Sequence, residues 1–542
     1  DINGYSNPAL LADVSINSTP VPQSQTETPV SALQKIRDVI AKENYERSEI
    51  TLSDGVVRIK GVHYPPVRKL SMSVDSFVNS TVVNPIVPPL VYSPKELRSF
   101  TENVMRNFRH SGYSFARMDT IEYDKKNGEL RGSINQGTMR YVYLHGNETV
   151  PTVVITREFE SLQLMPLQSG KLLQTWENLW NSNYFSSLEF IPRYVDSGAV
   201  DLLVDIKEQP NQMLRIGVRI DNERNTQVGL DMIQEHPFGT DFRFSGRIIG
   251  STRLQSISLG VDAARLFDSF WSADVRGFSS TTNMYNYGRR TGLPINEFEY
   301  LRAGDWVLQR NGIQALFGRQ IERKGKFYTQ LRYEYQRFFM SDDTLPHPKF
   351  VPLTSLKFAT RFDTQDRANL PTDGRVLEMS IESTILNPPN AVSFSKVEFL
   401  YKGTISFGSH SFTPSLHFGF GDKTMPLTEQ FSIGGEDSFY GKREDEERGQ
   451  QVALGSFEYR VQSPVRLFFD TYIAARYDIG SVWENFSTIK FSGLKHGLGL
   501  SLTLDTPLGL AKISIGQSVY FIDKPGIVRA PALGYFSIGA RL

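Results

Sequence analysis

The stretch MLRIGVRID (residues 213–221) alternates strictly between apolar and polar side chains. Leu214, Ile216, Val218 and Ile220 share one face of an extended chain, and arginine, glycine or aspartate stands between them. Alternation with a period of two residues is typical of a β-strand that has one apolar face. The stretch therefore predicts the first strand of a sheet.

The same alternation continues to the C-terminus and gives about sixteen strand candidates, an even number as bacterial barrels require. It recurs, for example, at residues 242–248, 257–262 and 536–542. Every second connection is short: residues 235–239, 265–269, 322–326, 407–409, 462–466 and 505–509. The connections between these include long polar stretches at residues 281–296, 340–351 and 421–449. Short turns on one rim and long loops on the other favour a transmembrane antiparallel β-barrel over a soluble β-protein.

Composition excludes several other classes of protein. The chain has no cysteine, and its eight histidines show no H-x-x-x-H spacing, so we expect no metal site and no cofactor. Its 59 basic and 59 acidic side chains cancel, so no net charge attracts nucleic acid. No run of eighteen apolar residues predicts a transmembrane helix.

The N-terminal part predicts two small α/β domains, at residues 67–137 and 138–210, followed by the barrel at residues 211–542. Each small domain has a helical segment and then a hairpin whose tight turn is Asn127-Gly128 or Ser197-Gly198. Exposed sheet edges in such domains can pair with an extended peptide, although the domains could equally be spacers.

Residues 1–66 form an N-terminal extension, for which we expect a hairpin and a short amphipathic helix. The apolar face of that helix would carry Leu33, Ile36, Val39 and Ile40. The helix would either pack on the first small domain or enter the barrel as a plug.

Four motifs resemble those of the superfamily of outer-membrane-protein assembly factors and two-partner secretion transporters, and they occur in the superfamily's order. DTQDR with PTDG (residues 363–374) is similar to the periplasmic turn D-x-R-D-n…P-t-x-G, with Gln365 where arginine is usual. QFSIGG with FYGK (residues 430–442) resembles the sixth extracellular loop. YDIGSVW (residues 477–483) resembles the strand motif F-x-D-x-G-x-V-W, and GLG with TPLG (residues 497–509) resembles a G-x-G…T-P-L-G stretch.

The resemblance, which covers Val67 to Leu542, implies polypeptide-transport-associated (POTRA) domains followed by a sixteen-stranded barrel. It also implies the site residues. They are Phe439, Tyr440, Gly441, Lys442 and Arg443 in the loop latch, Asp478, Gly480 and Trp483 in the strand motif, and Asp363, Asp366 and Gly374 in the periplasmic turn.

In the superfamily the arginine of a V-R-G-[FY] loop tip meets the aspartate of the strand motif inside the lumen. In this chain Tyr440 occupies the arginine position. Asp478 is then expected to accept a hydroxyl hydrogen bond from Tyr440, to pair with Lys442 or Arg443, or to remain a solvated carboxylate. The acidic run at residues 444–447 is expected to be an exposed loop tip.

The implied function is polypeptide translocation across the bacterial outer membrane, or insertion of proteins into it. The POTRA domains would bind the client in the periplasm, and the barrel would supply a pore or a weak seam between its first and last strands. The candidate seam residues are Gly217, Phe536 and Ile538. The expected partners are a secreted or outer-membrane client polypeptide, the lipid bilayer, and accessory subunits or a second copy of the chain.

Two alternatives remain open from the sequence. Some members of the superfamily carry a patatin-like phospholipase, and this chain would then be the membrane-anchoring barrel half. Such an enzyme needs a G-x-S-x-G motif, which this sequence lacks, so we do not expect the chain to be an enzyme. The second alternative is a passive channel.

Overall fold

The computed structural model describes residues 11–15, 34, 37–38, 45–53, 56–74, 86–195, 198–266, 269–321, 324–341, 348–386, 388–465, 468–521 and 526–539. The chain divides into two compact units, residues 1–148 with 155–209 and residues 149–154 with 210–542.

The first unit begins with a three-stranded antiparallel sheet in the order β1-β3-β2. Its strands are β1 (Leu11–Ser15), β2 (Tyr45–Ser53) and β3 (Val56–His63). The amphipathic helix expected at Leu33, Ile36, Val39 and Ile40 lies outside the described residues. Among the helices that are described, none is both long enough and apolar enough to cross a membrane.

Two α/β domains follow, and their sheets share one topology. In the first domain the order is β4-β6-β5, and in the second it is β7-β9-β8; each begins with a parallel pair and ends with an antiparallel pair. The first domain contains β4 (Lys69–Ser73), α3 (Pro94–His110), β5 (Arg117–Asp124) and β6 (Glu129–Asn135). The second contains β7 (Met139–His145), α4 (Thr152–Thr156), α5 (Ser169–Trp180), β8 (Phe185–Tyr194) and β9 (Val200–Glu208).

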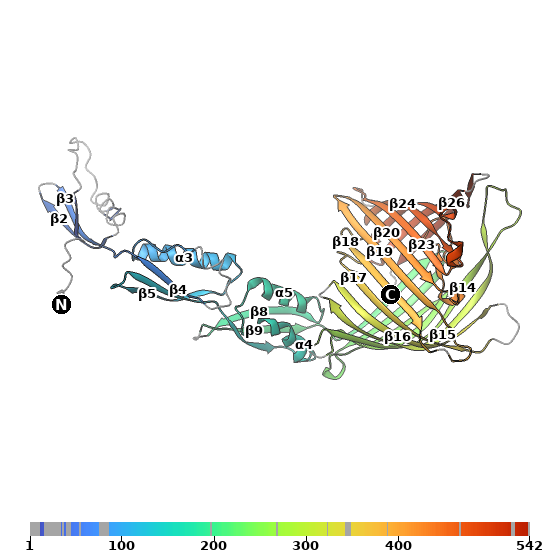
Figure 1. Ribbon diagram of the computed structural model, residues 1–542, viewed down its shortest axis with the longest axis horizontal. Helices are drawn as coiled ribbons and strands as arrows, with labels where there is room; N and C mark the ends of the chain where they lie inside the picture. Colours follow the sequence, from blue (N-terminus) through green and yellow to red (C-terminus); the bar gives the residue numbers. More distant parts are fainter. Residues whose placement is uncertain are drawn as a thin grey trace. The chain divides into compact units, whose positions relative to one another are not determined.

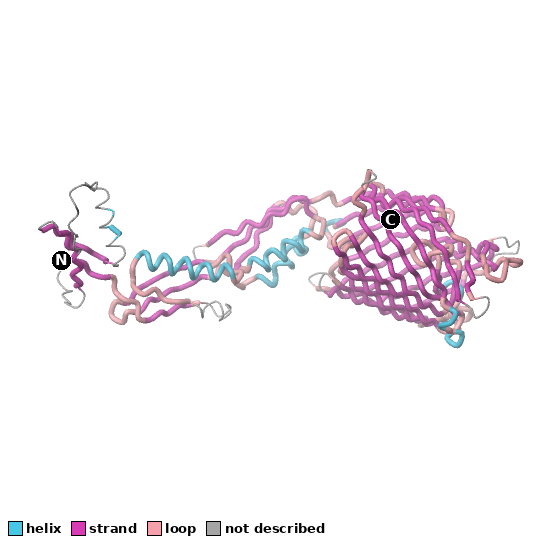
Figure 2. Tube along the Cα trace, turned by 90° about the horizontal axis from the view of Figure 1, so that it is seen from above, coloured by secondary structure: helices cyan, strands magenta, loops and turns pink. Residues whose placement is uncertain are grey.

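Helix α3 shows how the sequence builds the first domain. The Ser93 hydroxyl caps its N-terminus by accepting a hydrogen bond from the Glu96 N–H at 3.2 Å, and Pro94 follows at the first helical position. Phe100, Val104 and Phe108 lie three or four residues apart and are buried against the sheet. In Figure 2 the helices of the first unit are the cyan segments that run beside the magenta sheets. The outer strands of both sheets, β4 and β5 in one and β7 and β8 in the other, are edges without a further strand among the described residues.

The second unit is a closed antiparallel barrel of sixteen strands, which confirms the expected fold class (Figure 1). The strands are β10 (Gln212–Asp221), β11 (Asn225–Glu235), β12 (Arg243–Ser251), β13 (Leu254–Ala263), β14 (Trp271–Arg289), β15 (Tyr300–Ile321), β16 (Gly325–Met340), β17 (Val351–Asp363), β18 (Gly374–Thr384), β19 (Ser395–Phe407), β20 (His410–Gly421), β23 (Gln451–Gln462), β24 (Asp470–Trp483), β25 (Lys495–Thr506), β26 (Gly509–Phe521) and β28 (Leu533–Gly539). The short strand β27 (Ile527–Arg529) pairs with the end of β26.

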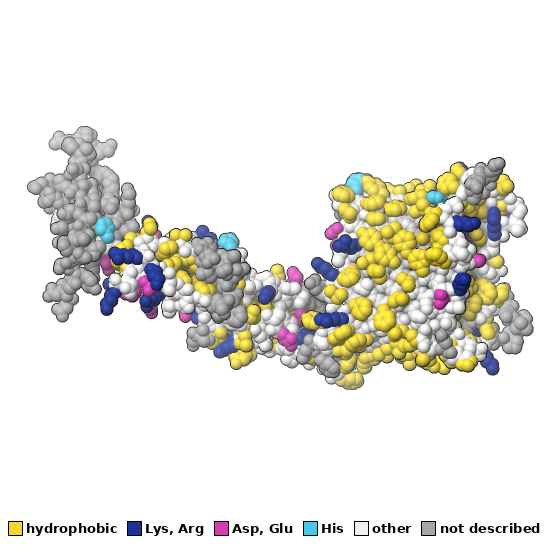
Figure 3. All heavy atoms as spheres, in the orientation of Figure 1, with side chains coloured by type: hydrophobic (Ala, Val, Ile, Leu, Met, Phe, Trp, Pro, Cys, Tyr) yellow, Lys and Arg dark blue, Asp and Glu magenta, His cyan; other side chains and the backbone are white. Residues whose placement is uncertain are grey.

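The apolar face of each barrel strand points outward. On β10 the side chains of Leu214, Ile216, Val218 and Ile220 are all exposed, whereas Gly217 is buried. Figure 3 shows apolar side chains gathered over the outer surface of the barrel. Because apolar groups face outward on strands all around a closed barrel, lipid is the environment that the outer surface fits.

The connections alternate as the sequence predicts, with two differences. The stretch expected to form a long loop at residues 281–296 is strand as far as Arg289, because β14 runs for 19 residues and pairs with the 22-residue β15. Two connections on the long-loop rim, between β10 and β11 and between β12 and β13, are tight turns. Where β14 and β15 extend past the lipid, water surrounds both faces, so the alternation that marks a strand is lost there.

Candidate functional site

The longest connection of the barrel, residues 422–450 between β20 and β23, folds into the interior. We call it the lumen loop. It contains a short ladder between β21 (Phe431–Ile433) and β22 (Glu447–Gly449). It contacts polar residues on opposite parts of the wall, as described below, and therefore lies in the lumen. The buried apolar residues of the loop and wall form one cluster, Leu353, Phe394, Met425, Phe431, Ile433, Phe439, Val452 and Leu454.

The tip of the lumen loop is held by a carboxylate on β24. Asp478, fully buried, accepts a hydrogen bond from the backbone N–H of Tyr440 at 2.8 Å. Arg476, two residues earlier on the same face of β24, forms an ion pair with Asp478 at 3.1 Å. The Arg476 guanidinium also lies 3.9 Å from the centre of the Tyr440 ring, a cation–π contact. Arg476 is thus held between a ring from the loop and a carboxylate from the wall.

None of the three charged or hydroxyl partners expected for Asp478 is found. The Tyr440 hydroxyl is buried and has no hydrogen-bond partner among the described residues. Lys442 points to Glu446 and Glu447, at 3.1 and 2.7 Å, and Arg443 points to Glu223 at 3.6 Å. These nearer carboxylates draw both cations away, and Arg476 supplies the positive charge instead.

Glycines on the wall make room for the loop tip. A Cβ on Gly499 or Gly516 would overlap the ring or Cβ of Tyr440, and one on Gly497 would overlap Phe439. The motif G-x-G at residues 497–499 therefore gives the loop close access to β25. Gly480 has the same role within the sheet, because a Cβ there would collide with the Ala453 carbonyl. Trp483 ends β24 opposite Gln451.

The acidic run at residues 444–447 is not an exposed tip, contrary to expectation. Lys442 is fully buried between Glu446 and Glu447, and Glu447 also pairs with Lys495. Charges buried to this degree are stabilised only when they are paired, which explains why basic residues stand on both sides of the acidic run.

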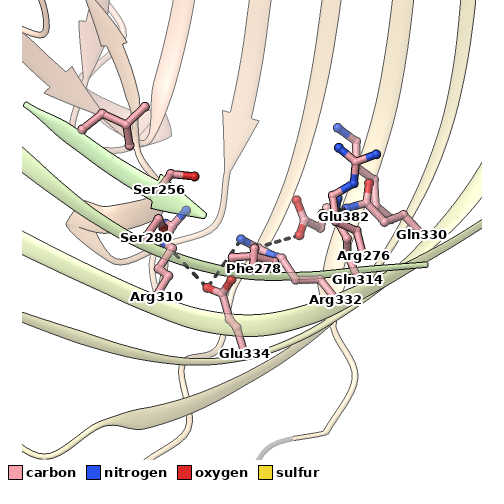
Figure 4. A pocket seen from close by; sticks show the side chains of 12 residues that line it. Ser256, Arg276, Phe278, Ser280, Arg310, Gln314, Gln330, Arg332, Glu334 and Glu382 are labelled. Atoms are coloured by element: carbon pink, nitrogen blue, oxygen red, sulfur yellow. Dashed lines mark hydrogen bonds and ion pairs between the residues drawn. The ribbon is translucent and has the colours of Figure 1, made fainter. Parts of the chain in front are cut away.

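A second carboxylate, Glu429, anchors the start of the lumen loop on the other side of the barrel. Glu429 forms ion pairs with Arg310 on β15 at 2.9 Å, with Arg332 on β16 at 3.2 Å and with Lys396 on β19 at 3.1 Å. A cavity of about 420 Å³ adjoins Arg310 and Arg332. Figure 4 shows Glu334 between Arg310 and Arg332, with Glu382 bound to Arg332.

The barrel closes through a short seam. Only three residue pairs, from Arg219↔Gly539 to Asp221↔Ser537, join β10 to β28 among the described residues, whereas ten join β10 to β11. The side chain of Asn222 extends the ladder, because it donates to the Gly534 carbonyl at 2.8 Å and accepts from the Phe536 N–H at 3.1 Å.

Two of the three expected seam residues take part in this closure. Ile538 pairs with Ile220, and the Phe536 carbonyl accepts a hydrogen bond from the Asn222 N–H at 3.2 Å. Gly217 pairs with Gly229 on β11, and its part in the seam stays a prediction, because residues 540–542 lie outside the described residues.

The lumen loop contacts both sides of the seam. On β28, the Tyr535 hydroxyl accepts from the Gly441 N–H at 2.9 Å and donates to the Lys442 carbonyl at 2.8 Å. On the first hairpin of the barrel, Arg224 binds Glu444 at 3.0 Å. Arg253, in the next turn, binds the same carboxylate at 2.8 Å.

The periplasmic turn between β17 and β18 is closed by its own polar groups. The Asp366 carboxylate accepts the N–H groups of Thr372 and Asp373 at 2.8 and 3.1 Å. Asp363 accepts the N–H of Gln365 at 3.2 Å. Gly374 has φ +98° and its Cβ would strike the Thr364 carbonyl, so only glycine fits there.

Sequence reasoning missed Arg476, Glu429 and the pair Arg224 and Arg253. A signal for Arg476 was present, since residues two apart on a strand share a face and Arg476 stands two before Asp478. It occupies the position of the phenylalanine in F-x-D-x-G, so ring and guanidinium have exchanged places between loop and strand. No local pattern pairs Glu429, Arg224 or Arg253 with partners so distant along the chain.

Comparison with known proteins agrees with this architecture. The sequence matches the Omp85 superfamily domain over residues 211–541. The fold is similar to BamA from Haemophilus ducreyi lacking POTRA domains 1–3, with a TM-score of 0.62, 13% identity, and coverage of 88% of this chain and 99% of that one.

Two CdiB structures are similar as well. CdiB from Escherichia coli has a TM-score of 0.57 at 15% identity, with 95% of this chain and 99% of that one covered. CdiB from Acinetobacter baumannii has a TM-score of 0.53 at 12% identity, with 93% and 96% covered. Because the sequence identities are low, these structural similarities establish a shared fold and nothing more. The family model, in contrast, matches more than half of the sequence. With its sixteen-stranded barrel preceded by POTRA-type domains, this chain belongs to the Omp85 superfamily of outer-membrane proteins.

Proposed function

We propose that this chain moves polypeptides across the outer membrane or inserts them into it, with the two POTRA-type domains, residues 67–137 and 138–210, in the periplasm. The short seam carries the proposal. Among the described residues, three pairs join β10 to β28, whereas six join β26 to β28 and eight or more join each other pair of neighbouring principal strands. The wall therefore has a defined point at which it can part. A polypeptide edge can then pair with β10 or β28.

The lumen loop supports the same proposal. It lies in the lumen and is anchored on at least three parts of the wall, so we expect a client that passes through the lumen to displace it. Buried ion pairs suit such an anchor, because charges that are exposed together regain water and lose little free energy.

The free edge strands of the α/β domains supply a binding site for the client before it reaches the barrel. An extended peptide adds to an edge strand through main-chain hydrogen bonds, which depend little on sequence. Strand β8 presents such an edge, and its Glu189 side chain is exposed.

Cross-linking in the full-length chain tests this function. The sequence has no cysteine, so Glu189→Cys on β8 and Lys171→Cys on α5 each give a single site for a photo-cross-linker. Both chains are reconstituted in vesicles and given a urea-unfolded porin as the probe. We expect cross-links from β8 only, and folding of the porin at a higher rate than in empty vesicles.

Equal cross-linking from both positions, or porin folding at the rate of empty vesicles, would refute the proposal for inserted clients. A chain that secretes its client instead would cross-link from β8 and leave the porin unfolded. Steady ion conductance that is unchanged by Glu189→Cys labelling and by the probe would favour a passive channel. We further propose that the chain has no enzymatic activity, which a phospholipase assay on the same vesicles tests.

A further inference from the structure

The hairpin of β14 and β15 is much longer than its neighbours, and its tip contacts a strand on the far side of the seam. β14 and β15 have 19 and 22 residues, whereas the four strands between them and the seam have 9 to 11. Tight turns join these four shorter strands in pairs at the same rim. The hairpin tip, which we define as residues 294–300, pairs with β27, the short strand between β26 and β28.

Backbone hydrogen bonds and a buried ring hold the hairpin tip on β27. Glu297 lies opposite Arg529 in a parallel bridge. The Arg529 carbonyl accepts a hydrogen bond from the Phe298 N–H at 3.1 Å, and the Arg529 N–H donates to the Asn296 carbonyl at 2.9 Å. Phe298 is 1% exposed, and its ring stacks on that of Tyr520 with 4.0 Å between the ring centres. The tip is therefore docked on β27 through both main chain and side chain.

This contact joins the two sides of the seam. The hairpin tip belongs to strands that are connected to β10 by a continuous ladder through β14, β13, β12 and β11. β27 belongs to the other side, because three residue pairs join it to β26, which pairs with β28. Among the described residues the sheet is therefore closed twice, once by the β10–β28 ladder and once by the hairpin tip. Separation of β10 from β28 carries β15 away from β26, so the second closure opposes it.

The lumen loop also contacts the hairpin tip. The Lys442 ammonium lies 5.7 Å from the centre of the Phe298 ring and 5.5 Å from that of the Tyr300 ring, within the range of cation–π contacts. The Lys442 carbonyl accepts a hydrogen bond from the Tyr535 hydroxyl on β28. A client that displaces the lumen loop would remove this support from the tip, so the contents of the lumen are linked to the closure of the seam.

We propose that the hairpin tip is a clasp that holds the seam closed and has to leave β27 before β10 and β28 part. Three residue pairs are a short closure, and the burial of Phe298 adds to it. Release of the clasp returns a large ring to water, so the docked clasp makes parting of the seam rarer. Because this inference rests on the parting of the seam in the proposed function, its test measures the seam itself, apart from transport.

A reversible disulfide in the full-length, cysteine-free chain tests the clasp. Glu297→Cys with Arg529→Cys places two thiols opposite each other in the bridge, so that oxidation locks the hairpin tip on β27 and reduction frees it. The control is Phe521→Cys with Ile527→Cys, which joins β26 to β27 on one side of the seam.

Amide hydrogen exchange of these variants in vesicles reports how often the seam opens. The amides to follow are those of the β10–β28 ladder, residues 219–221 and 537–539. We expect them to exchange roughly tenfold more slowly in the oxidised clasp variant than in its reduced form. The control variant should exchange equally in its two forms.

Equal exchange in the oxidised and reduced clasp variant would overturn the proposal, because the seam would then open with the hairpin tip in place. Slowing of the same size by the control disulfide would also overturn it, since a bond across the seam would then be unnecessary. Slower exchange at the seam together with an unchanged rate of porin folding would support the clasp and refute insertion through the seam.

A second variant removes the buried ring and needs no disulfide. Phe298→Ala should speed exchange at the seam roughly tenfold, because the clasp loses the burial of the ring. Phe486→Ala, which removes a ring that is 72% exposed on the β24–β25 connection, should leave the exchange as in the parent. Exchange at the seam that is as slow in a folded Phe298→Ala chain as in the parent would contradict the proposal.

Discussion

At the scale of single residues, the contact that most distinguishes this barrel is Arg476 between Tyr440 and Asp478. A buried carboxylate needs a positive charge near it, and the strand supplies that charge where the superfamily's loop does. The tyrosine ring then takes up the other face of the guanidinium. The contact keeps the same three groups, a carboxylate, a guanidinium and an aromatic ring. In this chain the strand carries the guanidinium and the loop carries the ring, whereas in the superfamily motifs the loop carries the arginine and the strand carries the phenylalanine.

Removing the guanidinium should release the loop tip. Arg476→Met leaves Asp478 buried without a counter-charge, which costs about 3 kcal/mol when one partner of a buried pair is lost. We expect the barrel to melt at a lower temperature, as measured by the loss of its heat-modifiable migration on gels. We also expect the lumen loop to become sensitive to added protease. The double variant Arg476→Phe with Tyr440→Arg should recover much of the loss, because the guanidinium returns from the loop. A double variant that is no better than Arg476→Met would show that the strand position itself is required.

A second prediction at this scale concerns pH. In the second α/β domain Arg140 donates two hydrogen bonds to Asp201, at 3.0 and 2.7 Å, and these hold the pKa of Asp201 below its ordinary value. A lowered pKa stabilises the fold at pH values above the unfolded pKa of about 4, and the contribution is lost as the pH falls through the folded pKa. Asp201→Asn should therefore lower the melting temperature at pH 7, and the difference from the parent should shrink towards pH 3.

Calorimetry of the full-length chain measures this effect in the transition of the first unit. Glu189→Gln on the neighbouring β8 removes a charge from an exposed position and serves as the control. A melting difference for Asp201→Asn that stays constant between pH 7 and pH 3 would show that the ion pair contributes nothing to stability.

At the scale of elements, the lumen loop is a 29-residue connection with separate anchors at its start and tip. Glu429→Gln should detach the start of the loop alone, because three cations then lack their shared counter-charge. We expect larger and noisier single-channel conductance in planar bilayers, with the barrel still folded. The control is Asp231→Asn, which breaks the ion pair of 2.7 Å between Asp231 and Arg247 on the wall and does not touch the loop. This variant should have the conductance of the parent. Equal conductance in Glu429→Gln and the parent would mean that the tip alone holds the loop.

The seam gives an element-scale prediction of its own. The Asn222 side chain makes two of the hydrogen bonds that join the first hairpin to β28, so Asn222→Ala should favour opening. Nitroxides at Ile220→Cys and Ile538→Cys, which are paired across the seam, report the separation through dipolar broadening of their spectra. We expect less broadening in Asn222→Ala. Broadening that matches the parent would show that the three-pair ladder closes the seam unaided.

The elements also show what sequence could and could not predict. Strands β10, β12 and β13 were predictable because lipid lies on one face and the lumen on the other, so every second residue must be apolar. The end of β14 was not, because Thr281, Asn283 and Asn286 extend beyond the region where lipid imposes that pattern. The motif residues around Asp478 were identified, but Arg476 was missed although it shares their strand. The partners of Glu429 were not predictable, because pairing across the lumen leaves no periodic trace in the sequence.

At the scale of the whole molecule, lipid on the outside and polar groups on the inside define the barrel. Leu259 and Ser258 are neighbours on β13 with opposite faces, and Leu259 is exposed to lipid. Leu259→Arg should reduce the free energy of folding into vesicles by about 2–4 kcal/mol, the range for arginine at the bilayer midplane. Ser258→Arg should be nearly neutral. Equal losses in the two variants, measured by urea unfolding in vesicles, would contradict the assignment of faces.

The unequal lengths of the strands also bear on what the cell displays. A membrane-spanning strand needs about 9–11 residues, so roughly ten residues of the 22-residue β15 are left over. At about 3.4 Å per residue these residues make a ribbon with β14 that measures some 30 Å along the strand. The base of this projection lies on the rim opposite the short turns. With the POTRA-type domains in the periplasm, as proposed above, that rim faces the outside of the cell, and we expect an antibody against the projection to bind intact cells.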